Sequence, residues 1–135
     1  MKKILSKINQ DKLISTIIRK SDITGYRKDL SPESEFIQVS ARKFEELIKV
    51  ESHKHLKLDR ETDRTQETWI IIQGAVKAKI FDLDDQLLLE EDLYSGDCIV
   101  LFRGGHSLEV LEKNTIMYEV KNGPYFGKLN DKTNI

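Results

Sequence analysis

The chain of 135 residues has little of several residue types, and each shortage excludes a class of protein. Its one cysteine, Cys98, excludes an internal disulfide framework and a metal site built from several thiolates. Its longest apolar runs, residues 69–72 and 98–102, are far shorter than the roughly 20 residues that a membrane helix needs. Lysine and arginine number 22 against 23 aspartates and glutamates, so the basic excess typical of nucleic-acid-binding proteins is missing.

What remains is typical of one soluble globular domain. The length and the 39% of apolar residues suit a single hydrophobic core. Polar residues 6–11 interrupt the apolar stretch that a signal peptide would need after the initial Met-Lys-Lys. Because a lone cysteine also fits a reducing compartment, we expect a cytoplasmic protein that binds neither nucleic acid nor membranes.

Apolar side chains recur near helical spacing in the first 20 residues. This spacing predicts one amphipathic helix or two short ones, followed by a polar arm that contains Pro32. We therefore divide the chain into an N-terminal helical segment and arm, residues 1–35, and a β domain, residues 36–135. The apolar positions are Ile4, Leu5, Ile8, Leu13, Ile14, Ile17 and Ile18.

From residue 36 onward, short segments rich in isoleucine, valine, leucine and aromatic residues alternate with turn sequences such as Gln73-Gly74. Closely spaced strands with no helix between them pair antiparallel, in a sandwich or a barrel. The predicted fold class is therefore all-β. The predicted strands are 36–41, 44–50, 69–73, 75–82, 86–93, 98–102, 107–111 and 115–121.

Three histidines and one glutamate are the candidates for chemistry. His53 and His55 would share one face of a strand, because alternate residues of a strand point the same way. Glu67 shares a face with Trp69 in the same manner, and His106 follows a Gly-Gly turn at the start of a predicted strand. Three imidazoles and a carboxylate suit a divalent transition metal such as Zn, Fe, Mn or Ni. Structural histidines hydrogen-bonded inside a core are the alternative.

The order of these residues resembles the two motifs of the cupin superfamily. The resemblance covers residues 44–121 and implies a small antiparallel jelly-roll barrel that holds a metal inside. Eleven residues separate His55 from Glu67, where cupins usually have three or four, and Phe102 and Val110 replace a common proline and asparagine. The first motif corresponds to His53-x-His55 and Glu67-x6-Gly74, and the second to Gly96-Asp97 and Gly104-Gly105-His106.

A narrower resemblance lies at the C-terminal end. The segment Tyr118-Glu119-Val120-Lys121-Asn122-Gly123-Pro124-Tyr125, followed by Asp131-Lys132, is similar to the end of the WbuC-like cupin-fold metalloproteins. Those proteins are associated with gene clusters for surface polysaccharides. This resemblance implies a sugar or nucleotide-sugar as the small-molecule ligand.

Together, the resemblances imply a small metal-binding cupin that binds or converts a small polar molecule as a homodimer. A metal-dependent isomerase, epimerase or oxygenase is one form of this function. A metal-independent sugar isomerase or epimerase and a non-catalytic binder of a sugar or metal are the alternatives. The implied metal ligands are His53, His55, Glu67 and His106, the implied catalytic residues are Glu67 and His106, and the expected pocket residues are Trp69 and Tyr118.

Overall fold

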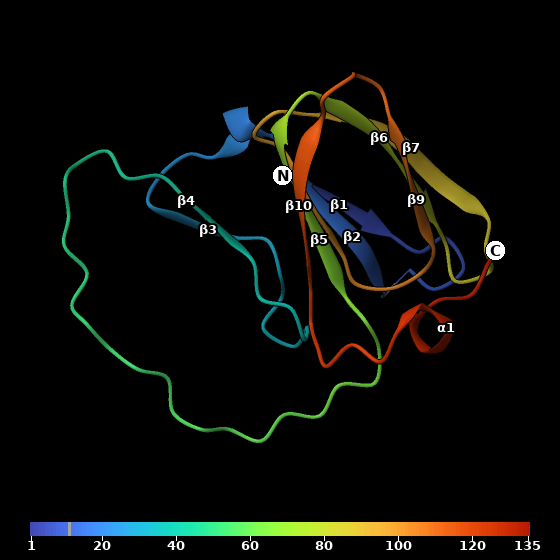
Figure 1. Ribbon diagram of the computed structural model, residues 1–135, viewed down its shortest axis with the longest axis horizontal. Coiled ribbons are helices and arrows are strands. Elements are labelled where there is room, and N and C mark those ends of the chain that lie inside the picture. The colour runs from blue at the N-terminus through green and yellow to red at the C-terminus, as the bar shows by residue number, and fades with distance from the viewer. Residues whose placement is uncertain (11) are drawn as a thin grey trace.

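The computed structural model of the chain describes residues 1–10 and 12–135 and contains two antiparallel sheets and a two-stranded ribbon (Figure 1). The two sheets pack face to face, and the ribbon of β3 (Arg27–Asp29) and β4 (Ser40–Arg42) lies to one side. The predicted all-β class is confirmed. The larger sheet has the order β1 (Lys2–Leu5), β2 (Leu13–Ile18), β8 (Cys98–Leu101), β5 (Glu67–Gln73) and β10 (Ile116–Lys121), and the smaller one β7 (Leu87–Tyr94), β6 (Ala75–Phe81) and β9 (His106–Val110).

The core lies between the two sheets. In β6, Val76, Ala78 and Ile80 are fully buried, while the lysines between them are partly exposed on the outer face. This period-two alternation is what a half-buried strand requires, and it explains why the predicted strands from residue 69 onward are confirmed. Trp69 and Ile71 of β5 contribute to the same core from the opposite sheet.

The predicted N-terminal helix is wrong, because residues 2–5 and 13–18 form β1 and β2 of the larger sheet. Ile14 and Ile17 pack in the core between the sheets, and Ile18 packs in a second apolar cluster. A strand covered on both faces shows no alternation of polar and apolar residues, so its apolar run imitated helical spacing. Three isoleucines and one threonine also give residues 13–18 a β-branched composition, which favours a strand.

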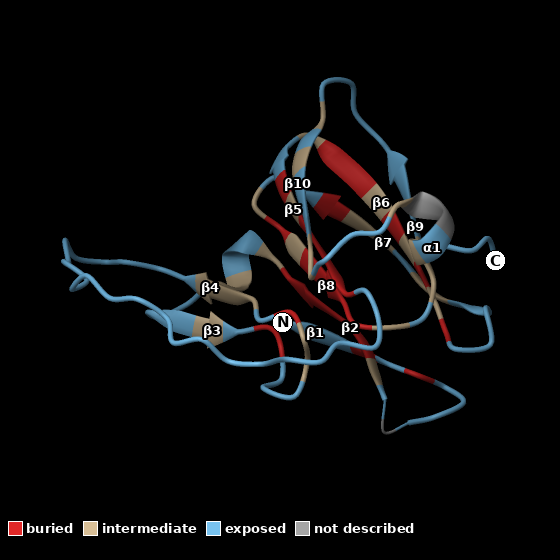
Figure 2. Ribbon diagram, turned by 60° about the horizontal axis from the view of Figure 1, so that its bottom comes forward, coloured by how far each residue is buried: buried red, intermediate tan, exposed pale blue. Residues whose placement is uncertain are grey.

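The second apolar cluster covers part of the outer face of the larger sheet. Leu30 and Ile37, from the arm that contains the ribbon, pack there against Ile18, Val100 and Phe102. The expected strand 36–41 is reduced to β4, and the expected strand 44–50 has no regular structure. Every residue from 42 to 65 is exposed, and this segment leaves β4 in a wide sweep before it joins β5 (Figures 1 and 2).

Two short helical elements complete the described chain, η1 (Lys20–Asp22) and α1 (Lys128–Asp131). No helix among the described residues is long and apolar enough to cross a membrane. The strands described here do not close into a barrel, because β9 and β10 follow one another in the chain yet are edge strands of different sheets.

Candidate functional site

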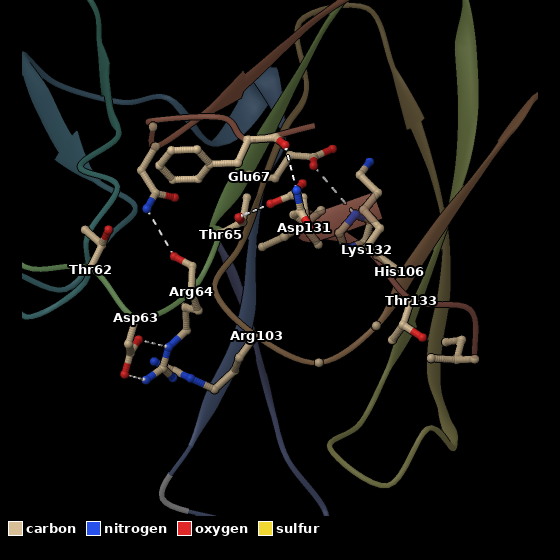
Figure 3. A pocket seen from close by; sticks show the side chains of 18 of the residues that line it. Thr62, Asp63, Arg64, Thr65, Glu67, Arg103, His106, Asp131, Lys132 and Thr133 are labelled. Atoms are coloured by element: carbon tan, nitrogen blue, oxygen red, sulfur yellow. Dashed lines mark hydrogen bonds and ion pairs between the residues drawn. The ribbon is translucent and has the colours of Figure 1, made fainter. Parts of the chain in front are cut away.

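Glu67 and His106 meet across the gap between the two sheets (Figure 3). Glu67 begins β5 in the larger sheet and is only 3% exposed, whereas His106 begins β9 in the smaller sheet. The distance from the Glu67 carboxylate oxygen Oε2 to the His106 imidazole nitrogen Nε2 is 3.8 Å. The structure therefore brings together two of the four predicted site residues.

The turn after β8 delivers His106 to this position. Gly104 in that turn has a φ of +74°, a conformation that glycine adopts more readily than any other residue. A Cβ atom at Gly104 would also contact the carbonyl oxygen of Phe81. A glycine at position 104 is thus required for the crossing from the larger sheet to the smaller one.

Trp69, from the core, contacts both Glu67 and His106 and orients them. Its indole nitrogen Nε1 donates a hydrogen bond to Oε1 of Glu67. Its ring stands edge-on to the imidazole of His106, with the ring centroids 5.4 Å apart. Trp69 is 3% exposed and lies in the core, so it supports the pair and is not one of the residues that line the pocket described below.

Lys121 also belongs to this site, although the two cupin-like motifs do not include it. It lies opposite Glu67 in the register between β10 and β5, with its ammonium nitrogen 3.1 Å from Oε2 of Glu67. The same nitrogen is 2.9 Å from Oε1 of Glu119. The buried carboxylate of Glu67 therefore has a cationic partner. The signal that could have identified Lys121 is the C-terminal segment 118–125, which contains both Glu119 and Lys121.

These contacts and the burial of the site shift the pKa values of its ionisable groups. Burial lowers the pKa of His106; the charge of Glu67 opposes this shift, and the charges of Lys132 and Lys121 add to it. Burial of Lys121 acts against its charge, but its hydrogen bonds to Glu119 and Glu67 prevail and raise the pKa of the ammonium. The hydrogen bond from Lys121 lowers the pKa of Glu119. At neutral pH, His106 is thus a neutral imidazole that can accept a proton.

The pair opens into a pocket of about 760 Å³ (Figure 3). Its walls come from the end of the 42–65 segment, the turn between β8 and β9, and the chain after β10. Most charged groups there already have partners: Arg103 Nη2 lies 2.7 Å from Oε1 of Glu35, and Arg64 forms an ion pair with Asp63. The pocket therefore offers hydrogen-bonding groups of both signs and no large excess of either charge.

The other two predicted metal ligands lie elsewhere. His53 and His55 are exposed on the 42–65 segment, with their ring centroids 5.6 Å apart, and neither lines the pocket of Glu67 and His106. Because this segment is a loop, no strand orients the two imidazoles towards a common metal position. Tyr118 of β10 is 64% exposed and also lies outside the pocket lining, because it alternates with the inward-facing Glu119 and Lys121.

The side chains that converge do not fit the four-ligand metal centre implied by the cupin resemblance. Glu67 and His106 lie together, His53 and His55 lie apart from them on the exposed segment, and the ammonium of Lys121 lies beside the carboxylate. In the described part of the chain, no group of three or more histidine, cysteine, aspartate or glutamate side chains is arranged to hold a metal ion.

Comparison with known proteins adds no relative. No family model matches the chain, and no significant match was found among curated proteins or solved structures. The geometry of the site and the residues that resemble the cupin motifs are therefore the features that bear on function.

Proposed function

We propose that this chain is a cytoplasmic, cupin-like jelly-roll protein that isomerises or epimerises a sugar or nucleotide-sugar without a metal. The observation that carries this proposal is the pairing of a buried carboxylate, Glu67, with an imidazole of lowered pKa, His106, at 3.8 Å beside a pocket. Support for the jelly roll comes from two antiparallel sheets packed face to face, with the residues of the second cupin-like motif at the β8–β9 turn.

The proposed reaction is a proton transfer at a carbon next to the sugar carbonyl. His106 accepts the proton through its neutral imidazole, and the substrate carbonyl becomes an enolate oxygen. The carboxylate of Glu67 stabilises the imidazolium that forms. For isomerisation, the hydroxyl proton on the deprotonated carbon moves to the former carbonyl oxygen, and His106 returns its proton to the former carbonyl carbon. For epimerisation, the intermediate turns in the pocket, and His106 returns the proton to the opposite face of the carbon from which it came. Lys132, which lines the pocket, supplies positive charge for the enolate oxygen.

The composition of the pocket supports a sugar. Its volume of about 760 Å³ is in the range of small-molecule sites. Arg64 and Arg103 in its lining are paired with the carboxylates of Asp63 and Glu35, so the pocket suits the hydroxyl-rich sugar part of a ligand. Phe126 also lines the pocket and is 73% exposed, which gives a ring against which the apolar face of a sugar can stack.

Metal-dependent chemistry is the second candidate, because the cupin resemblance implies it. It would require His53 and His55 to join Glu67 and His106 as ligands of Zn, Fe, Mn or Ni. The separation of the two histidines from the pocket favours the metal-independent form, and we derive no step through a metal. The two forms make different predictions for metal content.

The test is exchange of substrate hydrogen with solvent. Wild-type protein, treated with a chelator and then dialysed, is incubated in D2O with a panel of keto-sugars and nucleotide-linked keto-sugars, and deuterium uptake is followed by mass spectrometry. We expect His106→Gln and Glu67→Gln each to slow uptake by about 10²–10⁴-fold. Lys79→Gln, at an ion pair on the outer face of β6, is the matched control and keeps the wild-type rate.

Two results would contradict the proposal. One is uptake that is the same in wild type and in both site variants. The other is a stoichiometric metal, found by elemental analysis, that disappears in a His53→Ala/His55→Ala variant together with activity, which would establish the metal-dependent form instead.

A further inference from the structure

The outer face of the larger sheet is covered on one half only. Residues opposite one another in the sheet form a row from Thr16 of β2 through Val100 of β8 and Thr68 of β5 to Val120 of β10. The first three are at most 1% exposed, because the arm with Leu30 and Ile37 lies over that half. Val120, at the end of the row, is 46% exposed. The arm therefore leaves the outer face of β10 uncovered.

The uncovered half is apolar. Ile116, Tyr118 and Val120 project from the outer face of β10 and are 52%, 64% and 46% exposed, and Ile72 of β5 adds a further exposed isoleucine. β10 is also an edge strand with one unpaired side. Exposed apolar edges promote association with another chain, and proteins usually block them with charges.

The other outer edges of the two sheets carry such charges. β1 begins with two exposed lysines, Lys2 and Lys3, β7 contains Glu90, Glu91 and Asp92, and β9 contains Glu109. The charged residues of β10, Glu119 and Lys121, lie on its inner side, and its outer face has none at the three exposed positions. This contrast marks β10 as the edge that is adapted to receive a partner.

A second unpartnered apolar element lies on the same chain. In an extended conformation, residues 44–50 place Phe44, Glu46, Ile48 and Val50 on one side and Glu45, Leu47 and Lys49 on the other, so three of the four residues on the first side are apolar. In the structure these residues pair with no strand, and Leu47, Leu56 and Leu58 of the same segment are also exposed. A strand without a sheet is not stable by itself, so this segment requires a partner surface.

We infer that residues 44–58 of one copy lie along β10, on the uncovered outer face, of a second copy of the chain. Each copy has both the segment and the receiving face, so one two-fold pairing covers both segments and both faces at once. The exposed segment 42–65 also has the size of one side of a standard interface, about 20–30 residues. The predicted N-terminal helix is replaced by β1 and β2 of the larger sheet, so it supplies no surface for the dimer.

Light scattering on the full chain tests the association. We expect wild type to have the mass of two chains, and Leu47→Asp/Ile48→Asp and Tyr118→Ser/Val120→Asp each to raise the dimer dissociation constant by about tenfold or more while circular dichroism stays unchanged. Leu83→Asp, at an apolar residue that is 43% exposed in the turn between β6 and β7, is the control and leaves the dimer intact. A monomeric wild type overturns the inference, as does a dimer that is insensitive to the segment and β10 variants.

Cross-linking decides which chain supplies the segment. In a Cys98→Ser background, Ile48→Cys and Tyr118→Cys are placed on separate chains, mixed and treated with a short bis-maleimide. We expect a cross-linked dimer in the mixture, with little in either variant alone. If the mixture yields none, or if the double variant links only within one chain, the segment belongs to its own β10 and the inference fails. Neither measurement depends on the proposed reaction, so the dimer inference can fail while the proposed reaction stands, and the reverse.

Discussion

The indole of Trp69 stands edge-on to the imidazole of His106, with ring centroids 5.4 Å apart and ring planes at 80°. The same indole donates its N–H to the carboxylate of Glu67. One buried side chain therefore orients the two groups that the proposed reaction uses. The contribution of the indole to the stability of the fold can be measured.

Trp69→Phe separates the two roles of the indole. The phenyl ring keeps much of the contact with His106 but removes the hydrogen bond, which leaves an oxygen of the buried Glu67 carboxylate without its donor. We expect the free energy of unfolding, measured in urea, to fall by about 1–3 kcal/mol. Trp69→Ala removes the ring as well and is expected to cost about 3–5 kcal/mol. A Trp69→Phe variant as stable as wild type would contradict the assigned hydrogen bond, and equal losses in the two variants would contradict the packing role of the ring.

The lowered pKa of His106 gives stability a dependence on pH. Burial favours the neutral imidazole in the folded chain, so below about pH 6.5 the unfolded chain binds more protons at this residue. The contribution of His106 to stability is therefore complete above that pH and is lost as the pH falls from about 6.5 toward the lower folded-state pKa. Urea unfolding between pH 5 and 8 measures it, and His106→Gln should flatten this part of the profile. A profile that is identical in the variant would show that His106 is not buried as described.

Lys121 and Lys79 form a matched pair of strand lysines, each 3.1 Å from a carboxylate oxygen. Glu67, the partner of Lys121, is 3% exposed, whereas Glu90, the partner of Lys79, lies on the surface. We expect Lys121→Met to lower the free energy of unfolding by about 1.5–3 kcal/mol, because a buried carboxylate loses its charged hydrogen bond. Lys79→Met should change it by at most about 1 kcal/mol. Similar values for the two variants would contradict the role given to Lys121.

Gly74 and Gly25 allow a test of packing at constant backbone conformation. Their φ angles are +76° and +77°, but a Cβ at Gly74 would lie 3.0 Å from Cα of Thr115, while one at Gly25 would meet nothing within 4 Å. Gly25→Ala is expected to cost about 1–2 kcal/mol from the backbone alone. Gly74→Ala adds overpacking and should cost roughly 2–5 kcal/mol by thermal or urea unfolding. A smaller loss at Gly74 than at Gly25 would refute the close approach of Thr115.

β6 was predictable because one of its faces is exposed, and the buried β8 because turn sequences bound its short apolar run. The alternation of Lys77 and Lys79 with buried neighbours is visible in the sequence, and it defines β6 without further information. The strand at residues 13–18 could not be found in this way, since both of its faces are covered by segments distant in the chain. Only the tertiary structure distinguishes such a strand from a buried helix.

The candidate site was predictable to the same limited degree. Glu67 and His106 start strands next to turns, and the motif order was sufficient to select them. His53 and His55 satisfy the same motif by order alone, but the long connection to Glu67 leaves them on an exposed segment. Lys121 reaches Glu67 through the register of β10 with β5, which no local sequence pattern encodes.

The two members of the Glu67–His106 pair lie on different sheets, and no backbone ladder joins β5 to β9. Their separation is therefore a property of how the sheets pack, not of either sheet by itself. A compact state that retained its strands but loosened the contact between the layers would lose the pair before it lost secondary structure. The contact between Glu67 and His106 thus reports on the integrity of the tertiary fold.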